Sequence, residues 1–245
     1  EPRGRRAGPG ACQRHLHAGA GAVRSGAPGL RAVDFGDLGG VEPVGRAFGG
    51  DRGTPLDRRY IDRFLARHAG DIRGIVLEVG ETLYTTRFGG SAVEAAETVD
   101  GPETGNPQAT YLVDLQTGQG LPQRRFDCVI LTQTLHMTYD TRGVLRTVRE
   151  ALAPGGVVLA TVPGITPIDQ ADGPEKWFWA MTQSAARRLF AELFGPDHVE
   201  VEQFGNVYAA TAFLQGLAAE ELDADKLAVV DPLFPVITGI RAVRR

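Results

Sequence analysis

Short apolar runs rich in β-branched residues alternate with amphipathic segments from residue 54 to the end of the chain. The runs have the length of buried strands, and several of them break at glycine, proline or an acidic residue, as parallel strands do at their carboxyl ends. They predict strands at residues 75–79, 92–100, 109–115, 126–132, 156–163, 199–204 and 234–243. Apolar residues at helical spacing predict helices at residues 54–68, 141–152, 183–194 and 207–217.

The order of these elements predicts an α/β fold. A strand, a helix and a second strand in succession form a right-handed crossover unit, in which the two strands run parallel. An open sheet built from such units binds its ligand beyond the carboxyl ends of the strands. We therefore look for functional residues in the segments that follow the strands.

Five short segments carry a resemblance to a known family. They are Leu77-Glu-Val-Gly80, Val113-Asp-Leu115, Leu121-Pro, Phe126-Asp-Cys-Val-Ile-Leu and Leu152-Ala-Pro-Gly-Gly-Val-Val-Leu-Ala-Thr. In order and spacing they resemble the class I S-adenosylmethionine-dependent methyltransferases, from about Gly53 to the end of the chain. The resemblance implies a Rossmann-like, doubly wound, mostly parallel seven-stranded sheet with helices on both faces. It also implies an antiparallel last strand at the sheet edge, and S-adenosyl-L-methionine as the cofactor.

Composition divides the chain into two parts. Residues 1–30 are rich in Arg, Gly, Ala and Pro in no periodic order, and they predict a disordered tail or linker. Residues 31–245 predict a single methyltransferase-like domain, with a covering helix at about 54–68 and a core at 73–245. Thr54 is expected to cap that helix, and the loop before it is expected to fold over the cofactor.

Charge and cysteine content exclude several classes of protein. A net charge of -4 provides no overall attraction for nucleic acids or anionic lipids, which argues against both as partners. No apolar run approaches the roughly 18–20 residues of a membrane span, so a cytoplasmic protein is expected. Cys12 and Cys128 make neither a disulfide framework nor a metal site, and Cys128 is expected in the core. Because the chain begins with Glu, we interpret it as a possible module of a longer polypeptide.

The loop after the first strand departs from the family pattern. Family members carry a run of glycines there, whereas this chain has Thr82 and Tyr84 at two of those positions. By resemblance, Glu78 is expected to face the amino group of the cofactor, and Gly80 to lie beside its methionine part. Tyr84 is a candidate cofactor contact that closes the pocket, and Arg87 is a candidate ligand for an acidic substrate group. A packed tyrosine and a surface arginine are the alternatives.

Acidic residues end the second and third predicted strands. The resemblance assigns the ribose hydroxyls to Asp100, with Glu97 as the alternative, because a carboxylate accepts hydrogen bonds and hydroxyls donate them. It assigns the adenine amino group to Asp114, with the backbone at Leu115 beside the ring. A turn or helix cap is the alternative role of Asp114.

Polar residues also follow the fourth predicted strand. Thr132 and Gln133 are candidate contacts of the cofactor or substrate. His136 occupies a position where many family members carry histidine, and its ordinary pKa suits a base that takes a proton from an acceptor; packing under the adenosine or capping the next helix are the alternatives. Trp179, near Trp177, is a candidate floor of an acceptor pocket or an anchor for the next helix.

The leading functional hypothesis is methyl transfer to a hydroxyl group of a small molecule or sugar. Similar chains are often neighbours of glycosyltransferases or fused to them, so the resemblance implies a glycan acceptor and a glycosyltransferase module as a possible partner. One alternative is a degenerate methyltransferase domain that acts as a binding module, which the lost glycines favour. The other is a nicotinamide-dependent oxidoreductase, which would need a Gly-x-Gly-x-x-Gly turn that the chain lacks.

Overall fold

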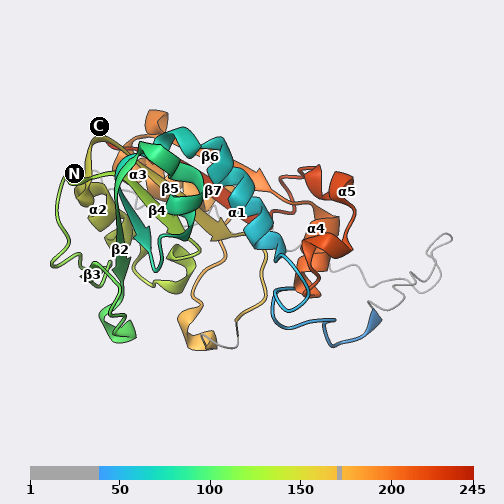
Figure 1. Cartoon of the computed structure of the whole chain (residues 1–245). Helices are drawn as coiled ribbons and strands as arrows, with labels where there is room; N and C mark the ends of the chain where they lie inside the picture. Colours follow the sequence, from blue (N-terminus) through green and yellow to red (C-terminus); the bar gives the residue numbers. More distant parts are fainter. Residues whose placement is uncertain (1–38, 170–172) are drawn as a thin grey trace, which may run out of the picture. The chain divides into compact units, whose positions relative to one another are not determined.

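One mixed sheet of seven strands organises the residues that the computed structural model describes, which are 39–169 and 173–245 (Figure 1). The tail expected at residues 1–30 lies outside the described residues. The strand order is β3-β2-β1-β4-β5-β7-β6. The strands are β1 (Gly74–Val79), β2 (Val93–Asp100), β3 (Tyr111–Leu112), β4 (Phe126–Thr132), β5 (Leu152–Pro163), β6 (Val199–Phe204) and β7 (Ile237–Val243).

Only β7 runs antiparallel to its neighbours, so the predicted mostly parallel sheet with an antiparallel last strand is confirmed. Its predicted place at the sheet edge is wrong, because β7 lies between β5 and β6. Burial explains this order. Most residues of β7 are buried, as a central strand requires, whereas β6 alternates valine with glutamate and tolerates the edge. The third strand is shorter than predicted, because the chain turns at Asp114.

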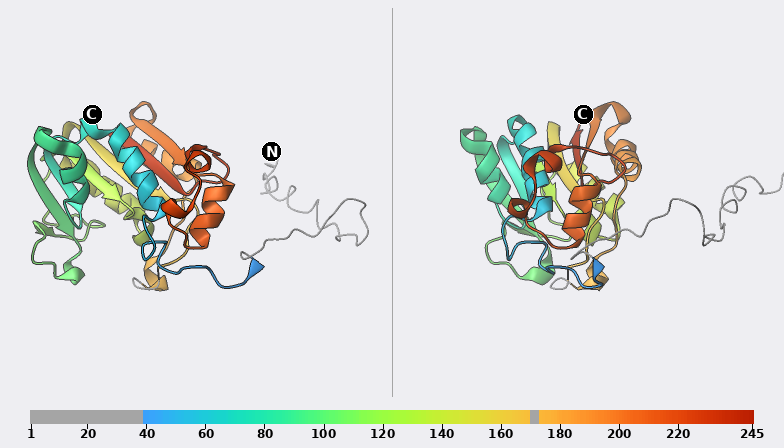
Figure 2. Two further views of the ribbon diagram at one scale, coloured as in Figure 1. Left: turned by 45° about the vertical axis from the view of Figure 1, so that its right-hand side comes forward. Right: turned by 90° about the vertical axis from the view of Figure 1, so that its right-hand side faces the viewer.

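Helices cover both faces of the sheet, as predicted. One apolar core lies between the sheet and the pair α2 and α3, and the other lies between the sheet and the pair α1 and α4. Figure 2 shows α1 crossing the face of the sheet over β5 and β7. The helices are α1 (Leu56–Arg67), α2 (Thr141–Ala151), α3 (Gln183–Phe194), α4 (Val207–Leu214) and α5 (Ala224–Ala228). No helix in the described ranges is long and apolar enough to span a bilayer.

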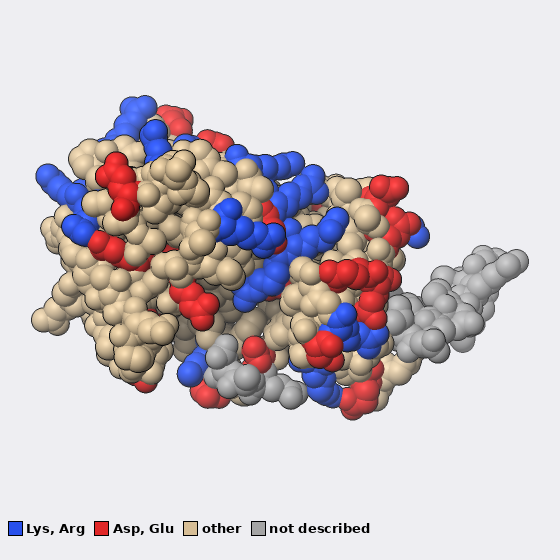
Figure 3. Space-filling model, in the orientation of Figure 1, with Lys and Arg blue, Asp and Glu red and all other residues tan. Residues whose placement is uncertain are grey.

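Arginine side chains gather over α1 on the face shown in Figure 3. Arg67 pairs with Glu202 of β6, and the guanidinium carbons of Arg63 and Arg67 lie 5.9 and 5.8 Å from the ring centre of Phe204. These contacts attach α1 to the neighbouring strand. On β4, Cys128 is fully buried, as expected for a core residue, and burial raises the pKa of its thiol.

Four side chains clasp the segment before α1 to the segment after α4. The Arg52 guanidinium donates hydrogen bonds to the Glu221 carboxylate. The Thr54 amide and hydroxyl donate to Glu220 at 2.8 and 2.6 Å. We call Arg52, Thr54, Glu220 and Glu221 the clasp. It fixes where α1 begins relative to α4.

The clasp corrects the expected role of Thr54. The N-cap of α1 is Pro55, which has no side chain able to accept a hydrogen bond from the helix. Thr54 instead bonds to Glu220, and its carbonyl accepts from the Ala219 amide at 2.9 Å. The capping pattern therefore predicted the start of the helix correctly, but the Thr54 hydroxyl bonds to Glu220 and does not cap the helix.

Backbones approach closely beside the clasp, and this requires glycine. Gly49 has a φ of +87°, and a β-carbon placed there would lie 2.6 Å from the carbonyl oxygen of Leu217. Gly216, with a φ of +68°, faces the carbonyl of Gly45 in the same way. Side chains at these positions would separate the two segments.

We expect Gly49→Ala to lower the free energy of unfolding more than Gly155→Ala. Gly155 has a similar φ of +81° but open space around it, so alanine there should cost only the about 1–2 kcal/mol of the left-handed region. The collision with Leu217 should add about 1–3 kcal/mol at Gly49. Urea unfolding of both variants measures the difference, and equal losses would contradict the close approach.

Candidate active site

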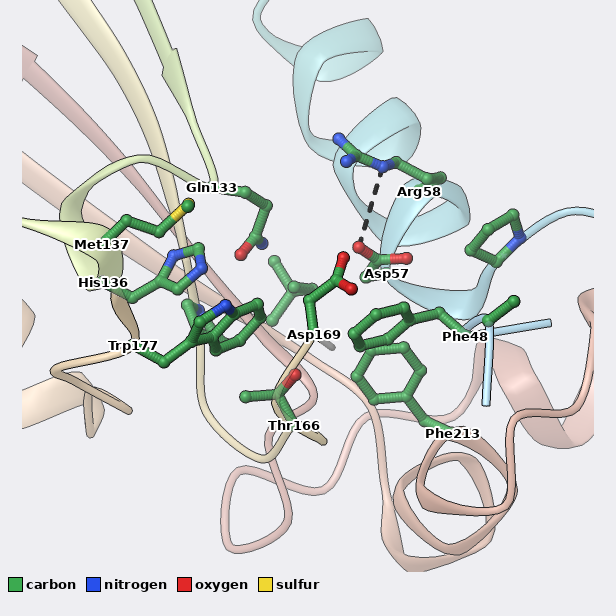
Figure 4. Close-up of a pocket in the computed structure, with 14 residues that line it drawn as sticks. Phe48, Asp57, Arg58, Gln133, His136, Met137, Thr166, Asp169, Trp177 and Phe213 are labelled. Atoms are coloured by element: carbon green, nitrogen blue, oxygen red, sulfur yellow. Dashed lines mark ion pairs between the residues drawn. The ribbon is translucent and has the colours of Figure 1, made fainter. Parts of the chain in front are cut away.

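A cavity of about 170 Å³ lies beyond the carboxyl ends of β4 and β5 (Figure 4). In Figure 4, His136 and Trp177 form one side, Asp57 and Arg58 reach in from α1, and Phe48 and Phe213 close the opposite side. The edge of an open α/β sheet where strand ends meet is the expected place for a ligand. The residues around the cavity are Ala47, Phe48, Pro55, Asp57, Arg58, Gln133, His136, Met137, Pro163, Thr166, Asp169, Trp177, Phe213 and Ile237.

Buried polar atoms without hydrogen-bond partners gather at this cavity. Of the seven such side-chain atoms found in the described part of the chain, five belong to its lining. They are Asp57 Oδ1, Gln133 Nε2, His136 Nδ1, His136 Nε2 and Trp177 Nε1. Each unpaired buried group costs about 1–3 kcal/mol, so a folded protein keeps such groups where they serve a purpose. The cavity is therefore suited to a polar ligand that satisfies them.

His136 is held rigidly at the cavity wall. Its side chain is 2% exposed, and its ring centre lies 4.4 Å from that of Trp177. Burial, aided by the charge of Arg58, lowers the pKa of His136 to about 4. The imidazole is therefore neutral at neutral pH. It does not cap the following helix, because Asp140 does so by accepting from the Gly143 amide at 2.9 Å.

Gln133 reaches the cavity through an unusual backbone turn. Its φ is +47°, in the left-handed region that residues other than glycine seldom occupy. Its amide donates to the Thr161 carbonyl at 3.0 Å, which holds the turn against β5. Strained backbone of this kind is concentrated at functional sites. Thr132, the preceding residue, does not line the cavity; its carbonyl accepts from the Thr134 hydroxyl.

The first turn of α1 contributes Asp57 and Arg58. The Arg58 Nε lies 3.7 Å from the Asp57 carboxylate, and the Arg58 guanidinium donates to the Tyr84 hydroxyl at 3.2 Å. Burial raises the pKa of Asp57, against the opposing effect of Arg58. Arg58 therefore connects the cavity to the loop that follows β1.

Aromatic rings close the cavity on the side of the clasp. The ring of Phe48 is stacked on Trp177, with centres 6.4 Å apart, and lies 5.8 Å from Phe213. The loop before α1 was expected to cover the site, and Phe48 is its contribution. Phe213 was not predicted, because on α4 it resembles any core residue.

Glu78 turns inward instead of facing an open cleft. Its carboxylate accepts hydrogen bonds from the Tyr84 amide at 3.0 Å and from the Thr85 amide and hydroxyl at 2.8 and 2.7 Å. The side chain is 3% exposed, and burial raises its pKa. The expectation that Glu78 faces the amino group of the cofactor stays a prediction. The Glu78 carboxylate caps the turn that leads into η3 (Thr85–Gly89).

Tyr84 and Arg87 stand in the same loop with different surroundings. Tyr84 is buried against Phe88, with ring centres 6.3 Å apart, which agrees with the alternative of a packed tyrosine. Arg87 pairs with Asp62 of α1 at 2.7 Å. Neither residue lines the cavity around His136.

A wider cleft of about 770 Å³ lies beside the loop after β1. Gly80 has a φ of +82°, and a β-carbon there would meet no atom within 4 Å, so its backbone faces open space. Asp100 lies next to this cleft, because its carboxylate accepts from the Asn106 amide at 3.2 Å. The residues around the cleft are Gly80, Glu81, Thr82, Leu83, Thr86, Arg87, Thr98, Asn106 and Gln108.

The remaining acidic candidates have local partners. Glu97, the alternative to Asp100, is paired with Arg125 and accepts from the Tyr111 hydroxyl at 2.7 Å. Asp114 is exposed and accepts from the Gln116 amide at 2.8 Å, while Leu115 packs against the core beneath α2. Neither Asp114 nor Leu115 lines the cavity or the cleft.

The methyltransferase domain family matches residues 40–220, which is most of the chain. The chain belongs to this family. It is a methyltransferase domain, as the resemblance predicted. That result sets aside the nicotinamide-dependent oxidoreductase. No curated protein matches the chain.

Solved structures with partial likeness to this methyltransferase come from several organisms. Phosphoethanolamine N-methyltransferase 2 of Haemonchus contortus is 15% identical, with a TM-score of 0.49 over 76% of this chain and 52% of that chain. An S-adenosylmethionine-dependent methyltransferase from Mesorhizobium loti is 19% identical, with a TM-score of 0.48 over 80% of this chain and 100% of that chain. The methyltransferase thus spans about half the length of the nematode enzyme. No residue's role is transferred from either structure.

The residues of the methyltransferase fit the cofactor at its amino-acid end. That end carries an ammonium group, which needs acceptors, and a carboxylate, which needs donors. Asp57 Oδ1 is an unpaired buried acceptor and Gln133 Nε2 an unpaired buried donor, and the Arg58 guanidinium lies beside them. The backbone at Gly80 leaves open space toward the cleft.

We expect His136→Phe to change how stability depends on pH. The folded protein holds the pKa of His136 at about 4, below the ordinary 6.5, so between these values the unfolded chain binds the proton more readily. Stability of the wild type should therefore fall as pH drops from 6.5 to 4, by up to about 3 kcal/mol from this residue. The His136→Phe variant should not show this loss of stability at low pH. Urea unfolding across the window measures it, and parallel curves would contradict the lowered pKa.

Proposed function

We propose that this methyltransferase acts on a hydroxyl group of a sugar-sized acceptor that enters the polar cavity. The observation that carries the proposal is the set of three unpartnered buried atoms on His136 and Trp177, which lie in the same cavity as the Asp57 and Gln133 atoms that fit the cofactor. Hydroxyl groups donate and accept hydrogen bonds, so a polyol satisfies donors and acceptors together. Phe48 and Trp177 supply apolar ring faces beside those polar atoms. A single sugar residue combines both properties.

The size of the cavity limits what part of an acceptor it holds. Its volume of about 170 Å³ is below the roughly 300–1,000 Å³ of pockets that enclose drug-sized ligands. We therefore assign it the reacting group and its immediate ring. A glycan acceptor, and a glycosyltransferase module as partner, remain predictions from the resemblance.

His136 is the proposed proton acceptor. When bound, S-adenosylmethionine supplies an electrophilic methyl group, and direct displacement requires the acceptor oxygen to be held in line with it. His136 is neutral at neutral pH, and both ring nitrogens are free of partners in the described chain. A base with a pKa of about 4 takes the proton as the new bond forms, when the hydroxyl becomes more acidic.

Residues at the strand ends are proposed to hold the cofactor. Asp57, Arg58 and Gln133 surround the place that fits its amino-acid end. The open backbone at Gly80 and the carboxylate of Asp100 border the cleft that suits its adenosyl part. The assignment of Asp114 to the adenine amino group remains a prediction from the resemblance, and its side chain is exposed just after β3.

The second candidate function is a binding module that has lost catalysis. The observation that favours it is the position of Glu78, which occupies the backbone amides of Tyr84 and Thr85. Those amides are no longer available to a cofactor. Binding measurements with S-adenosylmethionine separate the two functions, because a module without a cofactor site should not bind it.

We expect Asp114→Ala to weaken binding of S-adenosylmethionine about tenfold. Loss of one hydrogen bond to a charged acceptor removes about 1.5 kcal/mol, which corresponds to that factor. Isothermal titration measures the affinity. Asp197→Ala, in the turn before β6, is the matched control and should bind as the wild type does. An unchanged affinity for Asp114→Ala would remove Asp114 from the cofactor site.

We expect His136→Phe to lower kcat about 10²–10⁴-fold, the usual contribution of a general base. Affinity for S-adenosylmethionine should stay within about threefold, because the imidazole is assigned to the acceptor. Release of S-adenosylhomocysteine with a panel of monosaccharides and polyols measures turnover. In the wild type, turnover should fall as the pH drops through the lowered pKa of His136, which is about 4. Unchanged turnover in the variant would return His136 to a packing role.

A further inference from the structure

Besides the cavity and the cleft, a groove of about 580 Å³ lies where the turn before α2 meets the start of α3. Three aromatic side chains at this place are open to solvent: Tyr139 is 69% exposed, Phe178 is 44% exposed and Trp179 is 40% exposed. Tyr139 and Trp179 line the groove itself. Clustered exposed apolar surface is uncommon on soluble proteins and marks binding sites.

The rings are held in place before any ligand arrives. The Trp179 indole N–H donates to the Thr138 carbonyl at 3.0 Å. Tyr139 is stacked on Trp179, with ring centres 5.8 Å apart and an angle of 28° between planes, and meets Phe178 edge to face at 5.5 Å. Fixed rings lose little conformational entropy on binding. The indole edge is used internally, which leaves ring surface for a ligand.

Polar groups border the rings without creating a net charge. Arg142 pairs with Glu192 at 2.9 Å, and Arg188 lies 3.5 Å from the same carboxylate. Asp140 adds a second acid and already caps α2. The lining residues include these two arginines and Asp140, and Glu192 beside them pairs with both arginines, so the groove and its surroundings together carry no net charge.

The groove and the cavity are built on the same two segments. Met137 lines the cavity and Tyr139 the groove, and Trp177 lines the cavity and Trp179 the groove. The segments are joined at one atom, because the His136 carbonyl accepts from the amides of Phe178 and Trp179 at 2.9 and 3.2 Å. The cavity and the groove are therefore lined by residues only two positions apart on each segment.

We propose that this groove binds the neutral sugar residues of an oligosaccharide acceptor whose terminal unit enters the cavity. The inference rests on the proposed function and adds that the acceptor is longer than one sugar. Sugars present apolar ring faces and hydroxyl edges, which match the exposed rings and the paired charges. The groove has ten lining residues, far below the roughly 20–30 residues a side of a stable protein interface.

Binding to a printed array of neutral mono- to hexasaccharides tests the proposal. Wild-type retention should rise with chain length, and Trp179→Ala should reduce retention of the best-bound oligosaccharide at least tenfold. Phe234→Ala is the matched control, because Phe234 is 39% exposed but lies away from the groove, and it should bind as the wild type does. Thermal unfolding confirms that each variant is folded.

A second measurement uses the fact that the chain has only two tryptophans, Trp177 and Trp179. In the wild type, titration with the retained oligosaccharide should quench and blue-shift the tryptophan emission, and Trp179→Ala, which keeps Trp177, should lose most of that change. Retention without dependence on length, full retention by Trp179→Ala, or no retention by the wild type would overturn the proposal.

The proposed function is judged separately, by release of S-adenosylhomocysteine with monosaccharides. Turnover with a monosaccharide and no length-dependent retention would leave the proposed function standing and remove the groove. Length-dependent retention without turnover on any retained sugar would contradict the proposed function while keeping the groove as a sugar-binding surface.

Discussion

The clasp is the contact on which the site depends. Arg52 and Thr54 are held by two consecutive glutamates that lie about 170 positions later in the chain, and the Ala219 amide donates to the Thr54 carbonyl beside them. The start of α1 sets the positions of Asp57 and Arg58, and the loop before it carries Phe48. One long-range polar contact therefore determines both the charged and the aromatic walls of the cavity. The glycines at positions 49 and 216 are needed because the clasp draws two backbones together.

The local pattern of apolar residues predicted where the strands and helices lie, but it did not predict which of them are neighbours in the fold. The strand at residues 126–132 and the helix at residues 183–194 have the predicted bounds, because burial on one or both faces is visible as periodicity. The place of β7 inside the sheet could not be predicted, because the sequence of an apolar strand does not indicate which strands it pairs with. The third strand was predicted too long for a different reason, since the turn at Asp114 depends on one side-chain contact.

The candidate site shows the same division. His136 and Gln133 were found because they follow a strand end, where function is expected. The hydrogen-bond partners of Glu78 could not be predicted from the sequence. They are backbone amides six and seven residues later, and they reach the carboxylate only because the chain forms a particular turn there. Phe213 and the pairing of Trp177 with the cavity required segments that meet only in the folded chain. Trp177 and Trp179 were predicted as one group, whereas the fold places them on two different hollows.

The shared carbonyl of His136 has a thermodynamic consequence. Because that one oxygen accepts from the amides of Phe178 and Trp179, a shift of Trp179 in the groove would act on the backbone that carries His136 at the cavity. Two binding events that bias one anchor are coupled, and coupling of binding free energies is reciprocal. Occupation of the outer groove would then alter affinity in the inner cavity by the same factor as the reverse. A chain of this kind would bind a longer acceptor more tightly because its two hollows are coupled.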